Sequence, residues 1–154
     1  MLNETAIKEL QEIRSKYPSA RSALLPAIYV AQREFGWLSE EAYEAVSEVL
    51  GVPKAIARGV GAFYAMYKHR PMGRNIIQLC TNVSCMILGA ERLADYLKSH
   101  YGLVPGGTTE DGRFSLVIME CIGACGTAPA MLVNDEFYEN LSEQYIEEIL
   151  AKFT

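Results

Sequence analysis

The chain has 154 residues, of which 50% are hydrophobic and 21% are charged, and its formal net charge is −5. This length suits one domain with a full core or two small units, and the composition is that of an ordinary globular protein. An acidic balance without a lysine- or arginine-rich run excludes the basic surface that nucleic-acid binding normally requires. We therefore expect no nucleic acid among its partners.

The N-terminus and the apolar runs indicate a cytoplasmic protein. MLNETAIKEL contains an early acid and lacks the basic and apolar regions of a secretory signal. The longest apolar runs, such as residues 23–31, are too short to span a bilayer, so we expect no direct membrane insertion. In a reducing compartment, close pairs of cysteines favour metal ligands or redox groups over disulfides.

The N-terminal half carries helix signals only. Helical spacing of apolar residues predicts a helix over 4–16, which Pro18 ends. Ser22 is expected to cap a second helix, with Pro26 in its first turn and Gly36 just past its end. Two further helices are predicted from their boundary residues, which are the N-cap Ser39, the terminating Gly51 and the opening Pro53.

Beyond residue 74 the pattern changes to short strands alternating with helices. The predicted elements, in chain order, are β at 75–80, α at 84–101, β at 114–121, β at 130–134, β at 136–140 and α at 142–153. The last two strands are expected to form a hairpin around Asn134 and Asp135. The helix predicted at 84–101 is expected to turn five side chains inward: Ile87, Leu88, Leu93, Tyr96 and Leu97.

The whole chain therefore reads as four helices, a linker and then β-α-β-β-β-α, which is a mixed α+β or α/β architecture. We predict two domains with a boundary between residues 73 and 74. The helical domain, residues 1–73, is expected to dock against a partner. The linker carries His69, Arg70 and Arg74, which could contact an acidic partner surface or could simply be solvated.

The chain has four cysteines, and they form two close pairs, Cys80 with Cys85 and Cys121 with Cys125. A β-α-β unit makes two parallel strands with a right-handed crossover, so Cys80 and Cys121 should lie at the carboxyl ends of neighbouring strands. Ligands bind at that edge of open α/β sheets. The loop after each strand supplies the second thiol, so all four sulfurs are expected at one edge.

Three kinds of site could use four thiols in this arrangement. Structural zinc usually takes C-x2-C knuckles, whereas the gaps here are four and three residues. A thiol oxidoreductase also prefers C-x2-C, with a basic residue nearby. A two-iron, two-sulfur cluster needs two thiolates per iron, and one loop per iron is the natural division. The spacing favours the cluster and leaves a zinc-stabilised interaction module as the alternative.

Other features of the two loops agree with a cluster. The small residues Gly123, Gly126 and Thr127 let backbone N–H groups approach its sulfurs, and a helix N-terminus near Ser84 favours negative charge. Residues 75–91 and 114–135 contain no Lys or Arg. This scarcity of counter-charge predicts a low reduction potential.

The cysteine spacing and its surroundings resemble the thioredoxin-like [2Fe–2S] ferredoxin family. The pattern is C-x4-C followed by C-x3-C, with ECIGACGTAPAMLVN around the second pair. LLPAIYVAQREFGWLSEEA and VPKAIARGVGAFYAMY resemble the helical extension of one branch, the small [2Fe–2S] subunit of the NADH-dehydrogenase module of respiratory complex I. Homologues of this branch serve NAD-linked formate dehydrogenases and hydrogenases. The resemblance covers nearly the whole chain.

The resemblance implies both a fold and a function. Residues 74–154 would form a thioredoxin-like domain that holds one [2Fe–2S] cluster through Cys80, Cys85, Cys121 and Cys125. The chain would exchange single electrons with a flavoprotein subunit that binds FMN and NADH. It would have no NAD site of its own, and it would act without catalysing a reaction inside a larger multisubunit redox complex. That complex could hold it at the cytoplasmic face of the inner membrane.

Several other residues allow more than one interpretation. Thioredoxin-like folds often have a cis-proline where Pro129 stands, although an ordinary strand-start proline explains it equally simply. Strand alternation should point Glu120 away from the thiols. His69 and His100 could suggest a Rieske centre, but four cysteines already suffice, and we place both at the surface. Trp37, Phe63, Tyr64 and Tyr67 could form a partner-binding face, although we expect Phe63 in the helical core.

Overall fold

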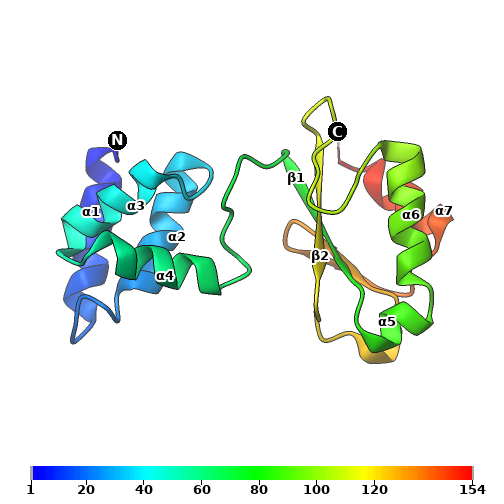
Figure 1. The fold of residues 1–154 in the computed structure, drawn as a ribbon, viewed down its shortest axis with the longest axis horizontal. Coiled ribbons are helices and arrows are strands. Elements are labelled where there is room, and N and C mark those ends of the chain that lie inside the picture. Colours follow the sequence, from blue (N-terminus) through cyan, green and yellow to red (C-terminus); the bar gives the residue numbers. More distant parts are fainter. Residues whose placement is uncertain (1, 154) are drawn as a thin grey trace. The chain divides into compact units, whose positions relative to one another are not determined.

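Figure 1 shows the fold as a computed structural model, in which residues 2–153 are described. The chain divides into two units, Met1–Pro71 and Met72–Thr154. The first contains helices only, and the second contains a four-stranded sheet with helices. Within the described residues, none of the helices has the length and apolar character needed to cross a membrane.

The first unit has four helices, and capping residues set their ends. They are α1 (Glu4–Lys16), α2 (Leu24–Phe35), α3 (Glu40–Leu50) and α4 (Lys54–Phe63). The Ser39 side chain accepts from the backbone N–H of Ala42 and caps α3, as predicted, and Gly36 and Gly51 end α2 and α3 in left-handed conformations. The predicted cap at Ser22 is wrong, because α2 begins at Leu24 and the Ser22 hydroxyl bonds to Ser19 instead.

The core of this unit lies between the helices and contains Leu10, Leu24, Ile28, Tyr43 and Val46. The expectation that Phe63 belongs to this core is wrong, since its side chain is 80% exposed. Helix α4 ends at Phe63, and the next residue, Tyr64, has an extended backbone conformation. The side chain buried in this region is therefore that of Tyr67 and not that of Phe63.

The second unit is built on a mixed sheet with strand order β2-β1-β3-β4. The strands are β1 (Asn75–Cys80), β2 (Phe114–Met119), β3 (Met131–Val133) and β4 (Glu136–Tyr138). β1 pairs with β2 in parallel, and β3 pairs antiparallel with both β1 and β4. These pairings confirm the predicted parallel β-α-β unit and the hairpin, whose turn places Asn134 at φ +56°.

Helices α5 (Val83–Ile87), α6 (Ala90–Tyr101) and α7 (Glu143–Leu150) complete this unit, with a 3₁₀ turn at Cys125–Thr127. Figure 1 shows α6 and α7 on the same side of the sheet. The core between them and the sheet contains residues from both layers: Ile77, Leu79, Phe114, Leu116, Met131, Leu93, Leu97, Ile146 and Ile149. A closed apolar core beneath the strands fixes their carboxyl ends in space.

The single helix predicted over 84–101 is wrong. Two helices replace it, because Gly89 adopts a left-handed conformation at φ +98° and breaks the run. Leu93 and Leu97 are buried as expected. Ile87 and Leu88 lie before the break, so they leave the inward face and are 73% and 56% exposed.

Replacing Asn134 with alanine should destabilise the sheet at the strand that carries the first cysteine. The Asn134 Oδ1 accepts from the backbone N–H of Ile76 at 2.9 Å, and its Nδ2 donates to Asn75 at 3.0 Å. Losing these bonds at a left-handed position is expected to cost about 2 kcal/mol of unfolding free energy, measured by urea denaturation. Asn134→Gly keeps the backbone conformation and should lose less; equal losses would contradict the argument.

Candidate metal centre

The first thiol lies at the carboxyl end of the central strand. Cys80 is the last residue of β1 and pairs in register with Met119, the last residue of β2. Its backbone N–H donates to the carbonyl of Ala130 at 3.2 Å, and the N–H of Thr81 donates to the carbonyl of Met119 at 3.2 Å. Backbone bonds from both neighbouring segments therefore hold this strand end.

The second thiol is carried back beside the first by a short helix. The Asn82 side chain accepts from the backbone N–H of Val83 at 2.6 Å and caps α5, and the carbonyl of Asn82 accepts from Met86 at 2.8 Å. This tight turn buries Cys85, which is 2% exposed, next to Cys80, which is 3% exposed. The two cysteines pack together in one small apolar cluster.

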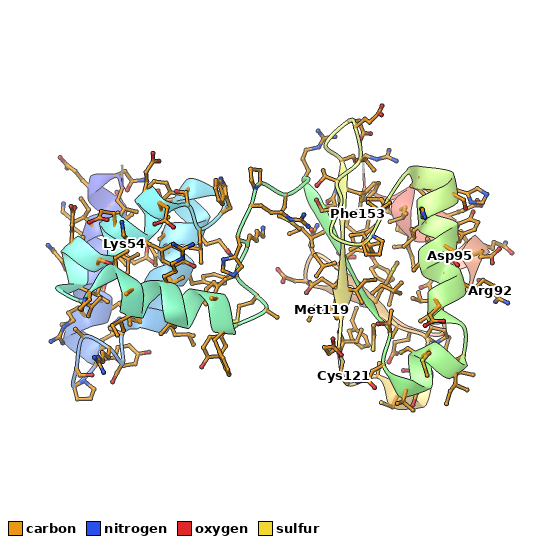
Figure 2. The ribbon with its side chains drawn as sticks, in the orientation of Figure 1. Lys54, Arg92, Asp95, Met119, Cys121 and Phe153 are labelled. Atoms are coloured by element: carbon orange, nitrogen blue, oxygen red, sulfur yellow. The ribbon has the colours of Figure 1, made fainter. Side chains whose placement is uncertain are left out.

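The other two thiols lie on the loop that follows β2, and both are exposed. Gly123 adopts φ +82°, and its backbone N–H donates to the Cys121 sulfur at 3.4 Å. Cys125 opens the 3₁₀ turn that ends at Thr127. Figure 2 shows Cys121 at the same end of the sheet as α5, the helix that carries Cys85.

The two loops meet around Cys80. Its sulfur lies 4.0 Å from the carbonyl oxygen of Glu120, the residue before Cys121. Ile122 packs with Cys80, Cys85 and Ala128 in a small apolar cluster of its own. The Glu120 side chain is exposed.

The backbone around the buried pair favours a thiolate on one sulfur. Burial acts to raise the pKa of the Cys80 thiol, but hydrogen bonds from the backbone of Asn82 and Ile122, together with that from Cys85, bring the pKa below its usual value. Burial and the neighbouring Cys80 raise the pKa of Cys85, and a further contribution comes from Cys125. A hydrogen bond from the backbone of Ala130 opposes this rise.

The sequence identified the thiols but not these backbone groups. Asn82, just before the second cysteine, has the residue type of an N-cap and could have been found from its position. Ala130 follows Pro129. The Ala128–Pro129 peptide bond is cis, so of the two interpretations of Pro129 the cis-proline is the one that the structure has. His100 lies at the end of α6, stacked on Tyr96, and takes no part in the thiol site.

The four thiols form two pairs with different surroundings, one buried and one exposed. Cys80 and Cys85 pack together in one cluster, and Cys125 opens the 3₁₀ turn on the loop after β2. In the part of the chain that the structure describes, no three His, Cys, Asp or Glu side chains gather tightly enough to hold a metal ion. The arrangement is therefore a contacting buried pair with an exposed pair on the adjoining loop.

The chain is similar to a family of iron–sulfur proteins and to subunits of NADH-quinone oxidoreductases. A family model described as thioredoxin-like [2Fe–2S] ferredoxin matches residues 10–154. A subunit of the NADH-quinone oxidoreductase of Rhizobium meliloti (strain 1021) is 39% identical over 149 residues, which are 97% of this chain and 89% of that protein. The NADH-quinone oxidoreductase subunit 2 of Thermus thermophilus is 39% identical over 145 residues, which are 92% of this chain and 80% of that protein.

A solved structure shares the fold. The crystal structure of the NAD⁺-reducing [NiFe]-hydrogenase in the air-oxidized state contains a region that matches 84% of this chain with a TM-score of 0.73 and 25% identity. This chain spans only 22% of that hydrogenase chain. The likeness therefore concerns one part of a much longer polypeptide.

The residues present fit a [2Fe–2S] cluster. All four cysteines are free thiols, two on each loop, and thiolates are the ligands that such clusters take. Backbone N–H groups already approach the sulfurs of Cys80, Cys85 and Cys121. Such bonds stabilise the negative charge that thiolate ligands and the cluster would carry.

The burial of the two pairs predicts two classes of thiol reactivity in the metal-free protein. Iodoacetamide is expected to modify Cys121 and Cys125 at least tenfold faster than Cys80 and Cys85, because only the first two are exposed. Timed quenching and peptide mass spectrometry would give the four rates, with urea-unfolded protein as the control. Equal rates in the folded protein would contradict the described burial.

Proposed function

Because the chain belongs to the thioredoxin-like [2Fe–2S] ferredoxin family, whose model matches residues 10–154, we propose that its four cysteines are the ligands of the family's cluster. The cofactor is one [2Fe–2S] cluster, which supplies one-electron redox chemistry when bound. Cys80 and Cys85 provide two thiolates from the end of β1 and from α5. Cys121 and Cys125 provide two from the loop after β2.

The observation that carries this proposal is the arrangement of two thiol pairs at the carboxyl ends of paired parallel strands. Cys80 ends β1, and the chain after β2 reaches Cys121 two residues beyond Met119, the register partner of Cys80. Cys125 follows on that loop and opens the 3₁₀ turn Cys125–Thr127. Four thiols from two adjoining loops match the division of ligands that two irons require.

We further infer that the chain is a non-catalytic electron-transfer subunit of an NADH:quinone oxidoreductase or a related NAD-linked complex. Its relatives named as NADH-quinone oxidoreductase subunits cover 92% or more of this chain, and they support this assignment. We place FMN and NADH on a partner flavoprotein subunit. This chain would exchange single electrons with that FMN.

The two units would have different roles. The second unit, from residue 72 onward, would hold the redox centre, with Cys121 and Cys125 at the surface where a partner can approach. The helical unit would dock against the flavoprotein. The complex as a whole would then keep this chain in the cytoplasm, peripheral to the inner membrane.

A reduction assay with the partner tests the proposed electron exchange. NADH alone is expected to leave the visible absorption of the cluster-loaded chain unchanged under anaerobic conditions. Adding a catalytic amount of the FMN-containing subunit of the same complex should bleach it within seconds. Rapid bleaching by NADH without the flavoprotein, or none with it, would overturn the proposed partner.

Substitution of single cysteines tests the ligand assignment. Each of Cys80→Ala, Cys85→Ala, Cys121→Ala and Cys125→Ala should lose most of its bound iron and sulfide, because every thiolate completes an iron site. Ser84→Ala is the matched control, since it changes a small polar residue beside Cys85 and should retain both. A cysteine variant with undiminished iron would remove that residue from the ligand set.

A further inference from the structure

The two exposed thiols differ in how the backbone around them is held. Cys121 lies two residues beyond β2, and its sulfur accepts from the N–H of Gly123 within the same loop at 3.4 Å. Cys125 begins the 3₁₀ turn Cys125–Thr127, in which the N–H of Thr127 donates to the carbonyl of Ala124 at 3.1 Å. The position of Cys125 therefore depends on what holds the Thr127 end of this turn.

Thr127 is held by two consecutive residues that follow β4. Its hydroxyl donates to the Glu139 carboxylate, and its carbonyl accepts from the N–H of Asn140 at 2.7 Å. Thr127 is half-buried, whereas Glu139 and Asn140 are exposed. Among the described residues, the bond from Thr127 to Glu139 is the one hydrogen bond between two side chains that residues 121–130 make.

The segment after β4 is itself anchored to the second unit. Asn140 adopts a left-handed conformation at φ +50°, and the N–H of the next residue, Leu141, donates to the carbonyl of Pro129 at 3.0 Å. Leu141 is buried and belongs to the apolar core of this unit. The Glu139 carboxylate is therefore carried on an anchored backbone, so its bond to Thr127 can resist movement of the turn.

Thr127 also connects the exposed thiol to the surroundings of the buried pair. The next residue, Ala128, packs in the small apolar cluster with Cys80 and Cys85. Two residues later, the carbonyl of Ala130 accepts from the N–H of Cys80 at 3.2 Å. Thr127 thus lies in the chain between Cys125 and the backbone that contacts the buried cysteines, where a bond can set the position of one pair relative to the other.

Glu139 brings a negative charge to this loop that no ion pair neutralises. Within residues 2–153, none of the ion pairs includes Glu139. Residues 114–151 contain no Lys or Arg. A carboxylate in this state repels any negative charge that is added close to it, although solvent weakens the effect at an exposed position.

We propose that Thr127 and Glu139 are positioning residues for the ligand Cys125. Their hydrogen bond, together with the backbone bond from Asn140, holds the turn that presents the Cys125 thiolate and so slows the release of that ligand. The Glu139 carboxylate also disfavours the electron that reduction adds, which lowers the reduction potential. This proposal rests on the proposed function, because it takes Cys125 to be a ligand of the cluster.

Paired substitutions separate the hydrogen bond from the charge. Thr127→Val and Glu139→Ala remove the bond, whereas Thr127→Ser keeps a donor and Glu139→Gln keeps an acceptor without the charge. The cluster-loaded chains are mixed with an iron chelator under anaerobic conditions, and the decay of visible absorption is followed. The first two variants should lose iron about fivefold faster than the original chain, as expected for one exposed hydrogen bond, and the second two at the original rate.

A dye-mediated redox titration measures the effect of the charge. Glu139→Gln and Glu139→Ala should both raise the reduction potential, so that the ratio of reduced to oxidised cluster at a given solution potential rises about threefold. Thr127→Ser should leave the potential unchanged. Glu110→Gln is the matched control, because it removes an exposed acid that precedes β2, at the strand end away from the cysteines. It should change neither the potential nor the rate of iron loss.

The metal-free protein gives a readout that needs no cluster. Glu139→Ala should raise the rate at which iodoacetamide modifies Cys125 about threefold above the rate in Glu139→Gln, which has the same charge and keeps the bond. The rate at Cys121, which lies before the 3₁₀ turn, should be equal in the two variants. Peptide mass spectrometry separates the two cysteines.

The outcomes distinguish this proposal from the proposed function. If Thr127→Val and Glu139→Ala release iron as slowly as the original chain, the positioning role is overturned while the ligand assignment stands. An unchanged potential in Glu139→Gln would overturn the placement of the carboxylate beside the ligand. If the original chain takes up no iron and sulfide, the proposed function fails and this proposal with it. If Thr127→Val does not fold, the comparison of Glu139→Ala with Glu139→Gln decides, because Glu139 is exposed.

Discussion

The parallel pairing of β1 with β2 is the constraint on which the redox site depends. It sets Cys80 opposite Met119, so the two cysteine loops leave the sheet at one edge and on adjacent strands. The bond from Thr81 to Met119 extends the pairing one step beyond β1. A shift in this register would move the Cys121 loop along the sheet relative to Cys80 and separate the thiol pairs.

The apolar core under the sheet keeps that edge in place. Phe114 and Leu116 from β2 and Ile77 and Leu79 from β1 are fully buried under α6 and α7. Cys80 and Cys85 lie beyond this core in a separate small apolar cluster, whereas Cys121 and Cys125 are exposed on the loop after β2. The fold therefore combines a buried apolar base with a partly exposed edge that carries the four proposed cluster ligands.

The sequence predicted the elements that local rules control. Ser39 caps a helix and Asn134 turns a hairpin, because capping and turn chemistry act over a few residues. The strands predicted at 75–80 and 114–121 pair in parallel, as a strand-helix-strand order favours, although the second strand ends at Met119. The sequence also singled out the four cysteines as one ligand set, and that assignment stays a prediction.

The errors arose where tertiary geometry overrides a helical pattern. An apolar run through Leu88 suggested one helix, yet Gly89 turns left-handed and leaves Ile87 outside. Phe63 fitted the apolar face of α4, but the helix ends there and Tyr67 takes the buried place. The backbone donors to the thiols could not be predicted either, because they depend on how two distant loops meet.

The most direct test of the central claim is the visible spectrum of anaerobically purified protein, with iron, zinc and sulfide assayed on the same sample. The account predicts a reddish-brown protein with iron and sulfide in equal amounts, whose colour bleaches with dithionite. A colourless protein that holds stoichiometric zinc and takes up no iron and sulfide on reconstitution would contradict it. The four thiols would then serve a structural metal, and the chain would be an interaction module.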